Sequence, residues 1–214
     1  MTDTRPLMIS RRILIASGAM ALPVRALGAV APMVTILGDS ITAGFGLPQA
    51  ASLPIQLHLS LERLHVPNRV RGAGVSGDTT ADGAARVDFS IRSDTQVVVV
   101  ALGGNDLLQG VDPKVTRANL ERILARLKER HMGVVLAGLH APRELGASYA
   151  RDFDDVFPAL AKAHDVTLYP DLLAGVARKP SLNQADAIHP NAQGVLVIAK
   201  KLAPVVAKEL AKRP

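Results

Sequence analysis

A serine, a histidine and an aspartate stand at positions from which they could carry out acyl transfer. Ser40 follows Gly38 and Asp39 directly after an apolar run, and Asp186 and His189 stand three residues apart near the end of the chain. A serine hydroxyl is a poor nucleophile near neutral pH unless a neighbouring base accepts its proton. An aspartate beside that base fixes the imidazole tautomer and stabilises the imidazolium ion. Asp186 and His189 are close enough in the chain to bond locally, and the three residue types are those that a Ser-His-Asp centre uses.

Both short motifs also have a purely structural interpretation. Gly-Asp-Ser before a helix is typical of an N-cap, with Ser40 as the capping residue. Asp186 and His189 could form a capping turn before the last helix. The two roles of Ser40 are compatible, because a helix N-terminus also favours developing negative charge. The motifs therefore have to be judged against the elements that would position them.

Short apolar runs alternate with longer helical patterns from residue 33 onward. The apolar runs predict strands over residues 33–37, 69–75, 96–102, 132–139 and 166–169. Helical periodicity covers residues 53–64, 81–91, 115–130, 148–164 and 191–211, the last bent or relaxed at Pro204. Strands and helices that alternate in this way imply parallel strands joined by right-handed crossovers. We therefore expect an α/β fold, a three-layer α/β/α sandwich with a parallel five-stranded sheet of flavodoxin-like build.

Polar loops follow the apolar runs at the places where such a sheet binds ligands. In open parallel sheets the ligand crevice lies at the carboxyl ends of the strands. The loops there are GDS at 38–40, SGDT at 76–79, GGND at 103–106 and, near the end of the chain, DAIHPN at 186–191. Together they supply a hydroxyl, an imidazole, carboxylates, a side-chain amide and exposed N–H groups. These are the parts of a serine acyl-transfer site.

Four sequence blocks resemble those of the GDSL or SGNH hydrolases. They are ILGDSITAGFGL at 36–47, AGVSGDTT at 73–80, ALGGNDLLQG at 101–110 and DAIHPNAQG at 186–194. The blocks stand in the family's order, and the likeness, which covers essentially residues 33–210, is to its bacterial arylesterases, thioesterases and lysophospholipases. The resemblance implies the SGNH hydrolase fold. It also implies that Ser40 is the nucleophile, His189 the base and Asp186 its partner.

The resemblance further implies an oxyanion hole. Its donors would be the backbone N–H groups of Ser40 and Gly77 and the side-chain amide of Asn105. Without the other blocks, Gly77 would be interpreted as part of a tight turn and Asn105 as a turn former. We expect the remaining acids of the blocks, Asp39, Asp78 and Asp106, to organise the loops as hydrogen-bond acceptors.

The chain departs from the family's pattern near the expected acyl pocket. Leu107 and Ala187 stand where the family commonly has Gly, and Gly72 stands where Asn is usual. We expect Leu107 to narrow or reshape the acyl pocket beside Asn105. The segments 107–114 and 141–150 are the candidates for substrate contacts, through Leu107, Leu108 and Pro142.

Composition excludes several other classes of site. The chain has no cysteine, so a thiolate nucleophile, a disulfide scaffold and a Cys-ligated metal site are excluded. Aromatic residues are 3% of the chain and Trp is absent, which disfavours stacking on nucleic-acid bases or sugar rings. The histidines other than His189 lack partners at metal-ligand spacing, and no phosphate-binding glycine motif is present. We therefore expect no cofactor and no metal.

The net charge of +6 does not by itself indicate a nucleic-acid partner. Residues 1–28 carry Arg5, Arg11, Arg12 and Arg25 against Asp3, half of that charge. The basic residues of the last helix are interpreted as a solvated face. Their charge also leaves open a transient contact with membrane lipid. We expect a monomer that does not bind nucleic acid.

Residues 1–28 have the order of an export signal. A basic stretch that ends in Arg11-Arg12 precedes the modestly apolar residues 13–22, and small residues follow at 26–28. The paired arginines resemble a twin-arginine signal. An amphipathic first helix is the alternative. We expect a hydrolase domain over residues 29–214 and an address in the periplasm or beyond.

These observations predict a serine hydrolase that acts on a small-molecule ester. It would cleave carboxylic esters, or thioesters, of acyl, aryl or lysophospholipid substrates through an acyl-enzyme intermediate. A carbohydrate acetylesterase on the same fold is the alternative within hydrolases. A non-catalytic module that binds lipid or a protein partner is the alternative outside them.

Overall fold

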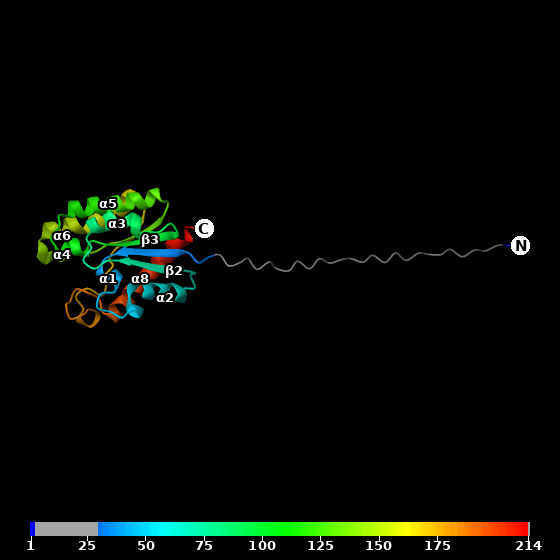
Figure 1. Ribbon diagram of the computed structural model, residues 1–214, viewed down its shortest axis with the longest axis horizontal. Coiled ribbons are helices and arrows are strands. Elements are labelled where there is room, and N and C mark those ends of the chain that lie inside the picture. Colours follow the sequence, from blue (N-terminus) through cyan, green and yellow to red (C-terminus); the bar gives the residue numbers. More distant parts are fainter. Residues whose placement is uncertain (3–29, 214) are drawn as a thin grey trace. The chain divides into compact units, whose positions relative to one another are not determined.

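The carboxyl ends of five parallel strands form the edge of the sheet at which the polar loops meet. The computed structural model describes residues 1–2 and 30–213. Its strands are β1 (Met33–Gly38), β2 (Arg69–Gly74), β3 (Thr95–Ala101), β4 (Gly133–Ala137) and β5 (Thr167–Tyr169). They pair in the order β2-β1-β3-β4-β5, every pair parallel (Figure 1). The predicted five-stranded parallel sheet is confirmed.

Helices cover both faces of this sheet and complete the predicted three layers. The helices are α1 (Ser40–Ala43), α2 (Leu53–Arg63), α3 (Thr80–Ser90), α4 (Gly104–Leu108), α5 (Pro113–Glu129), α6 (Ala147–Asp154), α7 (Val156–His164) and α8 (Ala192–Ala211). Short 3₁₀ turns occupy Gln49–Ala51, Arg143–Leu145 and Pro180–Leu182. Helices α2 and α8 pack together on one side, while α3, α5 and α7 pack in turn on the other (Figure 1).

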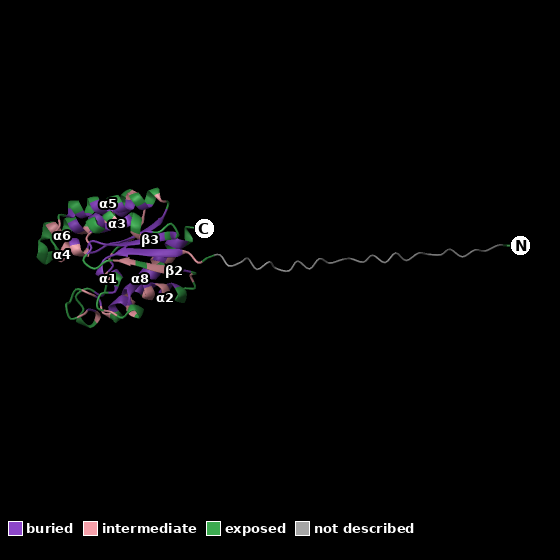
Figure 2. Cartoon of the chain, viewed as in Figure 1, coloured by how far each residue is buried: buried purple, intermediate pink, exposed green. Residues whose placement is uncertain are grey.

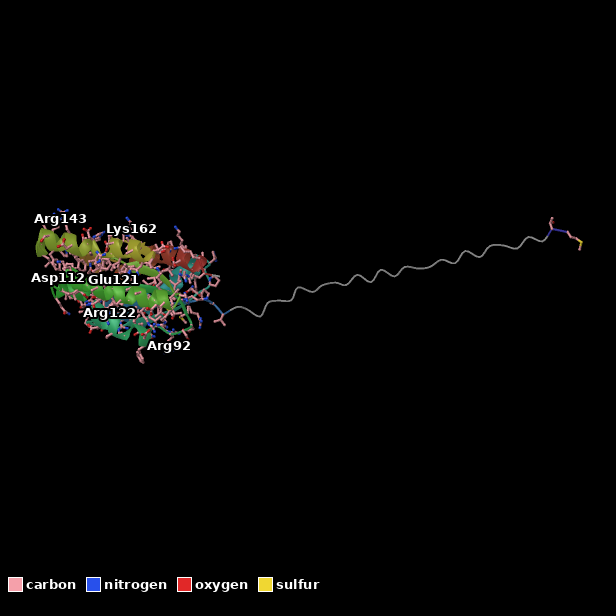
Figure 3. The ribbon with its side chains drawn as sticks, turned by 90° about the horizontal axis from the view of Figure 1, so that it is seen from above. Arg92, Asp112, Glu121, Arg122, Arg143 and Lys162 are labelled. Carbon is pink, nitrogen blue, oxygen red and sulfur yellow. The ribbon has the colours of Figure 1, made fainter. Side chains whose placement is uncertain are left out.

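The core lies between the two helical layers and along the central strands. Val97, Val98, Val99 and Val100 of β3 are fully buried, as expected for a central strand covered on both faces (Figure 2). The outer faces of the helices instead carry charged side chains of both signs, such as Glu121, Arg122 and Lys162 (Figure 3). No helix in the described residues is long and apolar enough to cross a membrane.

Proline explains the main difference from the predicted helices. Residues 148–164 were expected to form one helix, but the structure divides them into α6 and α7 at Asp155. Pro158 lies at the fourth position after Asp154, and a proline ring clashes with the carbonyl group four residues before it. Helix α6 therefore ends at Asp154, the residue whose carbonyl group Pro158 would contact. Pro204, in contrast, is accommodated inside α8, which continues to Ala211.

Helix caps fix where the site-bearing loops end. Thr79 caps α3 in a capping box, in which the Asp82 carboxylate accepts the Thr79 N–H at 2.9 Å. Gly74 lets α1 pack directly on the end of β2, because a Cβ there would lie only 2.3 Å from the Ala43 nitrogen.

The predicted export signal at residues 1–28 lies outside the described residues, apart from the first two.

Candidate active site

Ser40 is the first residue of α1 and follows the end of β1 directly. The N-cap of this short helix is Asp39, whose Oδ1 accepts the Ile41 N–H at 3.0 Å. The interpretation of Ser40 as the capping residue is therefore wrong. Because Asp39 performs the capping, the Ser40 hydroxyl is left to interact across the site.

His189 contacts Ser40 and Asp186 through its two ring nitrogens. The His189 Nε2 lies 2.9 Å from the Ser40 Oγ, and the His189 Nδ1 lies 2.6 Å from the Asp186 Oδ2. The other oxygen of Asp186 accepts the backbone N–H groups of Ile188 and His189 at 2.9 and 3.0 Å. The turn therefore orients Asp186 toward the imidazole. It does not cap α8, because Asn191 does so instead.

The hydrogen bonds to Asp186 determine which form of the histidine faces the serine. The backbone N–H of His189 is the largest of several contacts that lower the pKa of the Asp186 carboxyl to about 2. Asp186 is therefore ionised at neutral pH and accepts a hydrogen bond from the Nδ1–H of the His189 imidazole. That tautomer leaves the lone pair of Nε2 free to accept the Ser40 hydroxyl proton.

Two of the predicted oxyanion donors are backbone N–H groups at bends of the chain. Gly77 has a φ of +90°, a conformation that favours glycine. Within the described part of the chain, neither the Ser40 nor the Gly77 N–H donates to a protein acceptor. The loop of Gly77 is attached to β1, because the Val75 N–H donates to the Gly38 carbonyl at 3.1 Å. Both groups are thus free to donate to a ligand.

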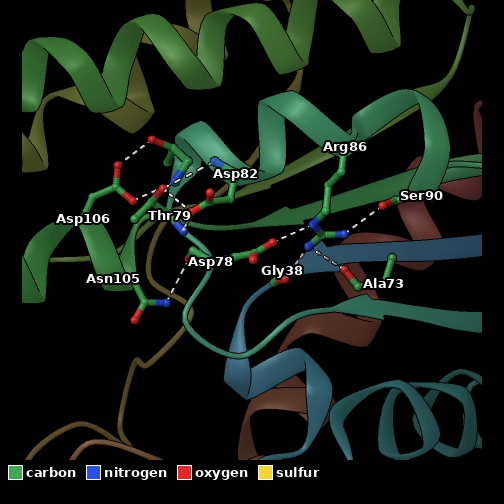
Figure 4. A network of polar contacts seen from close by, with 10 residues as sticks. Gly38, Ala73, Asp78, Thr79, Asp82, Arg86, Ser90, Asn105 and Asp106 are labelled. Carbon is green, nitrogen blue, oxygen red and sulfur yellow. Dashed lines mark hydrogen bonds and ion pairs between the residues drawn. The ribbon is translucent and has the colours of Figure 1, made fainter.

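The third predicted donor, Asn105, lies in α4 after β3. Its Nδ2 donates to the backbone carbonyl of Asp78 at 2.8 Å (Figure 4). A side-chain amide has two hydrogens, so this bond orients Asn105 and leaves one hydrogen for a ligand. The loops of Gly77 and Asn105 are therefore joined directly.

Asp106 joins α4 to the helices that flank it. It is buried, and its carboxylate accepts the Thr80 N–H at 2.8 Å and the hydroxyl groups of Thr80 and Thr116. These bonds connect the start of α3, the helix α4 and the start of α5. Asp39, Asp78 and Asp106 all accept hydrogen bonds that organise the loops, as expected.

The Asp39 carboxyl is buried, and its pKa lies above the usual range. Burial beside Ser40 raises the pKa of Asp39 to about 6, although the Ile41 N–H and the nearby His189 act in the opposite direction. Within the described residues, only one of its oxygens, Oδ1, accepts a hydrogen bond. The carboxylate is thus poorly compensated for its loss of water.

The structure adds two residues that the sequence motifs did not single out. The ring of Phe45 lies 4.7 Å from the ring of His189, centroid to centroid. Gln184 Nε2 donates to the Phe45 carbonyl at 2.8 Å and to the Pro190 carbonyl at 3.1 Å. Gln184 thus links the segment after Ser40 to the loop of His189. Phe45 lies in the sequence block at 36–47, but the motif assigned it no role. No sequence pattern indicated Gln184.

The three predicted substrate contacts do not reach the hollow beside Ser40. That hollow is lined by Ser40, Ile41, Gly44, Phe45, Leu47, His189, Pro190 and Val195. Leu107 lies within α4 and packs against the core, whereas Leu108 is 61% exposed. Pro142 precedes the 3₁₀ turn Arg143–Leu145. Their part in substrate binding stays a prediction.

No group of three or more acidic or histidine side chains in the described residues could hold a metal ion. His58 Nδ1 lies 2.8 Å from Asn68 Oδ1 and its Nε2 lies 3.5 Å from Glu62 Oε1, whereas His140 Nδ1 lies 3.1 Å from Asp154 Oδ2.

Residues 36–196 match the model of the GDSL-like lipase/acylhydrolase family. The chain belongs to this family. It is 36% identical over 183 residues to the thioesterase 1/protease 1/lysophospholipase L1 of Escherichia coli strain K12. The aligned region covers 83% of this chain and 86% of that protein. It is 34% identical over 176 residues to an arylesterase of Vibrio mimicus, which covers 82% of this chain and 88% of that protein.

Solved structures of the family agree with the fold. The SGNH-hydrolase family esterase AlinE4 is 40% identical, with a TM-score of 0.72 over 86% of this chain and 99% of that chain. A structure of TesA is 30% identical, with a TM-score of 0.78 over 83% of this chain and 99% of that chain. The predicted family is confirmed, and the names of these relatives agree with the predicted ester hydrolase.

Proposed function

We propose that this GDSL-family protein is a serine ester hydrolase in which Ser40 is the nucleophile. The observation that carries the proposal is the contact of 2.9 Å between His189 Nε2 and Ser40 Oγ, with Asp186 on the opposite ring nitrogen. A hydroxyl, an imidazole and a carboxylate in this sequence of contacts have the geometry of an activated nucleophile. The family membership of the chain supports the same reaction class.

The reaction would proceed in two halves. In the first, the Ser40 Oγ attacks the carbonyl carbon of the ester while its proton passes to the His189 Nε2. The tetrahedral intermediate then collapses, and the departing alcohol or thiol takes that proton. In the second half, water loses a proton to the same nitrogen and attacks the acyl-enzyme, which releases the acid and restores Ser40.

The developing negative charge on the carbonyl oxygen needs preorganised donors. We assign this role to the backbone N–H groups of Ser40 and Gly77 and to the free hydrogen of the Asn105 amide. Removal of one such donor typically lowers kcat by about 10²–10³. The bond from Asn105 to the Asp78 carbonyl supports the assignment, because it fixes the amide before substrate arrives.

The substrate class that we favour is an acyl ester or thioester with an apolar acyl group. Relatives over most of the chain are named as a thioesterase and lysophospholipase and as an arylesterase. Apolar side chains near the site are exposed, including Phe45 against His189 and Ile188 beside it. The intact contact between Ser40 and His189 argues against a non-catalytic binding module.

We also propose that the enzyme is exported and acts as a monomer. Residues 1–28 would serve as a signal, of twin-arginine type, ahead of the hydrolase domain at 29–214. N-terminal sequencing of protein recovered from the periplasm tests the signal, and an intact Met1 there would contradict it. Size-exclusion chromatography with light scattering tests the monomer.

Hydrolysis of p-nitrophenyl esters from acetate to palmitate tests the proposed function. The full chain should release p-nitrophenol with an optimum above acetate, and Ser40→Ala should lose this activity. An optimum at acetate, with equal rates on acetylated sugars, would favour the carbohydrate acetylesterase. Activity that persists in a folded Ser40→Ala protein would refute the nucleophile.

A further inference from the structure

Arg86 on α3 lies at the centre of a polar network that the proposed chemistry does not use. Its Nε donates to the Asp78 carboxylate at 2.5 Å, and one terminal nitrogen donates to the Ser90 hydroxyl at 2.8 Å (Figure 4). The other terminal nitrogen donates to the carbonyl groups of Gly38 at 2.9 Å and Ala73 at 3.0 Å. Each nitrogen of the guanidinium group is therefore engaged.

The partners of Arg86 belong to the segments that carry the proposed oxyanion donors. Gly38 ends β1 two residues before Ser40. Ala73 and Asp78 lie on either side of Gly77 in the chain. The backbone carbonyl of Asp78 in turn accepts the Asn105 amide at 2.8 Å. One side chain thus connects the segments of all three donors.

The environment of Arg86 suits a side chain that holds other groups in place. The Arg86 side chain is 19% exposed and the Asp78 side chain 11%, so solvent screens their ion pair less than a surface pair. Arginine presents donors in a rigid planar fork, and this geometry can satisfy a carboxylate and two carbonyl groups together. A lysine offers a single nitrogen, which could not span the same partners.

We infer that Arg86 is a positioning residue that sets the relative placement of the oxyanion donors. This inference rests on the proposed function. Arg86 would not touch the substrate. It would act through Asp78, which orients Asn105 and ends the loop of Gly77, and through the Gly38 carbonyl, which fixes the end of β1 before Ser40.

Positioning of this kind has a kinetic signature that general stabilisation lacks. Donors that act on the oxyanion matter chiefly in the transition state, so their displacement lowers kcat and leaves KM little changed. A misplacement of about 1 Å can cost on the order of 100-fold in rate. We therefore expect Arg86→Met to lower kcat roughly 10- to 100-fold. Asp78→Asn removes only the ion pair and should lower kcat less.

The experiment is a double-mutant cycle between Arg86→Met and Asn105→Ala in the full chain. If Arg86 acts through the donors, Arg86→Met should lower kcat by a several-fold smaller factor in the Asn105→Ala variant than in the wild type. Arg126→Met is the matched control. Arg126 Nε pairs with Asp88 of α3 at 2.7 Å but contacts none of the donor segments, so kcat should not change. Thermal unfolding of each variant shows that it is folded at the assay temperature.

A measurement without turnover decides the inference independently of the proposed function. In amide NMR spectra, Arg86→Met should shift the Gly77 N–H and the Asn105 side-chain amide, whereas Arg126→Met should not. Multiplicative losses in the cycle, or unchanged Gly77 and Asn105 resonances, would overturn the role of Arg86. If Arg86→Met does not fold, Arg86→Lys takes its place in both measurements with the same criteria, because a lysine cannot span the same partners. Loss of the proposed function would appear separately, as hydrolysis by the wild type that does not depend on Ser40.

Discussion

His189 Nε2 lies 2.9 Å from Ser40 Oγ, although the two residues are 149 positions apart in the chain. The contact brings the loop before α8 to the end of β1. It depends on Asp186, whose Oδ2 lies 2.6 Å from His189 Nδ1, and on Gln184, which bonds the Phe45 and Pro190 carbonyls. The geometry of the dyad is thus set by the tertiary structure of the whole sheet edge.

If Ser40 and His189 act in one step, their substitutions should not be additive. Ser40→Ala and His189→Ala should each lower kcat by roughly 10⁴-fold or more, and the double variant should cost little further. Steady-state kinetics on one p-nitrophenyl ester measures all three. Losses that multiply would contradict a shared mechanism.

Asp186→Asn should lower kcat by less than either of these substitutions, roughly 10²- to 10⁴-fold. The amide that replaces Oδ2 no longer attracts the proton of Nδ1 with a full charge, so the productive tautomer is less populated. Because the pKa of the Asp186 carboxyl is about 2, wild-type activity should show no titration of this group between pH 4 and 8. A titration of the Asp186 carboxyl itself in this range, followed by NMR of its side-chain carbon, would contradict the assignment.

Asp39 should make the protein less stable as the pH rises from 4 to 7. Burial raises the pKa of Asp39 from 3.8 to about 6, so between these values the folded protein keeps a proton that the unfolded chain loses. The free energy of unfolding therefore falls as the pH rises, by about 3 kcal/mol in total, and levels off above pH 6. Asp39→Asn keeps an N-cap and should remove this dependence.

Urea unfolding of the wild type and Asp39→Asn at pH 4, 5, 6 and 7 measures the effect. The stability difference should change in favour of Asn by about 2 kcal/mol across the series, because part of the total change lies below pH 4. A difference that does not vary with pH would show that the Asp39 carboxyl does not titrate in this range.

Ala187 is a site where glycine should stabilise the protein. Its φ is +59°, in the left-handed region that costs a non-glycine residue about 1 kcal/mol or more. This is also a position at which the family commonly has Gly. Ala187→Gly should raise the free energy of unfolding by up to about 1 kcal/mol, since the greater flexibility of the unfolded chain offsets part of the gain. A lower midpoint of urea unfolding would contradict this.

Local patterns were sufficient to predict the strands, the layers and the residues of the dyad. Strand β3 is an unbroken β-branched run, and the polar loops follow the strands, so their meeting at one sheet edge could be foreseen. The break between α6 and α7 was not predicted, because the effect of Pro158 falls on Asp154, within a stretch of good helical period. The Gly-Asp-Ser motif alone does not show whether Asp39 or Ser40 caps α1. The structure decides it, because the Asp39 side chain accepts the Ile41 N–H.

Long-range side-chain contacts limited the prediction of the rest of the site. Arg86 lies on an ordinary helix face, and its bonds to Gly38 and Ala73 span 48 and 13 positions. Gln184 reaches Phe45 across 139 positions. Leu107 and Leu108 were expected to contact substrate, but they lie in α4, where Leu107 packs against the core.

The most direct test of the account is covalent labelling of Ser40 with a p-nitrophenyl alkylphosphonate. The phosphonate mimics the tetrahedral intermediate, so attack by Ser40 should release one p-nitrophenol per chain and leave the phosphonyl group on the Ser40 Oγ. Intact-mass and peptide mass spectrometry should find a single adduct on Ser40 in the wild type and none in Ser40→Ala. An adduct on another residue, or equal labelling of Ser40→Ala, would contradict Ser40 as the nucleophile.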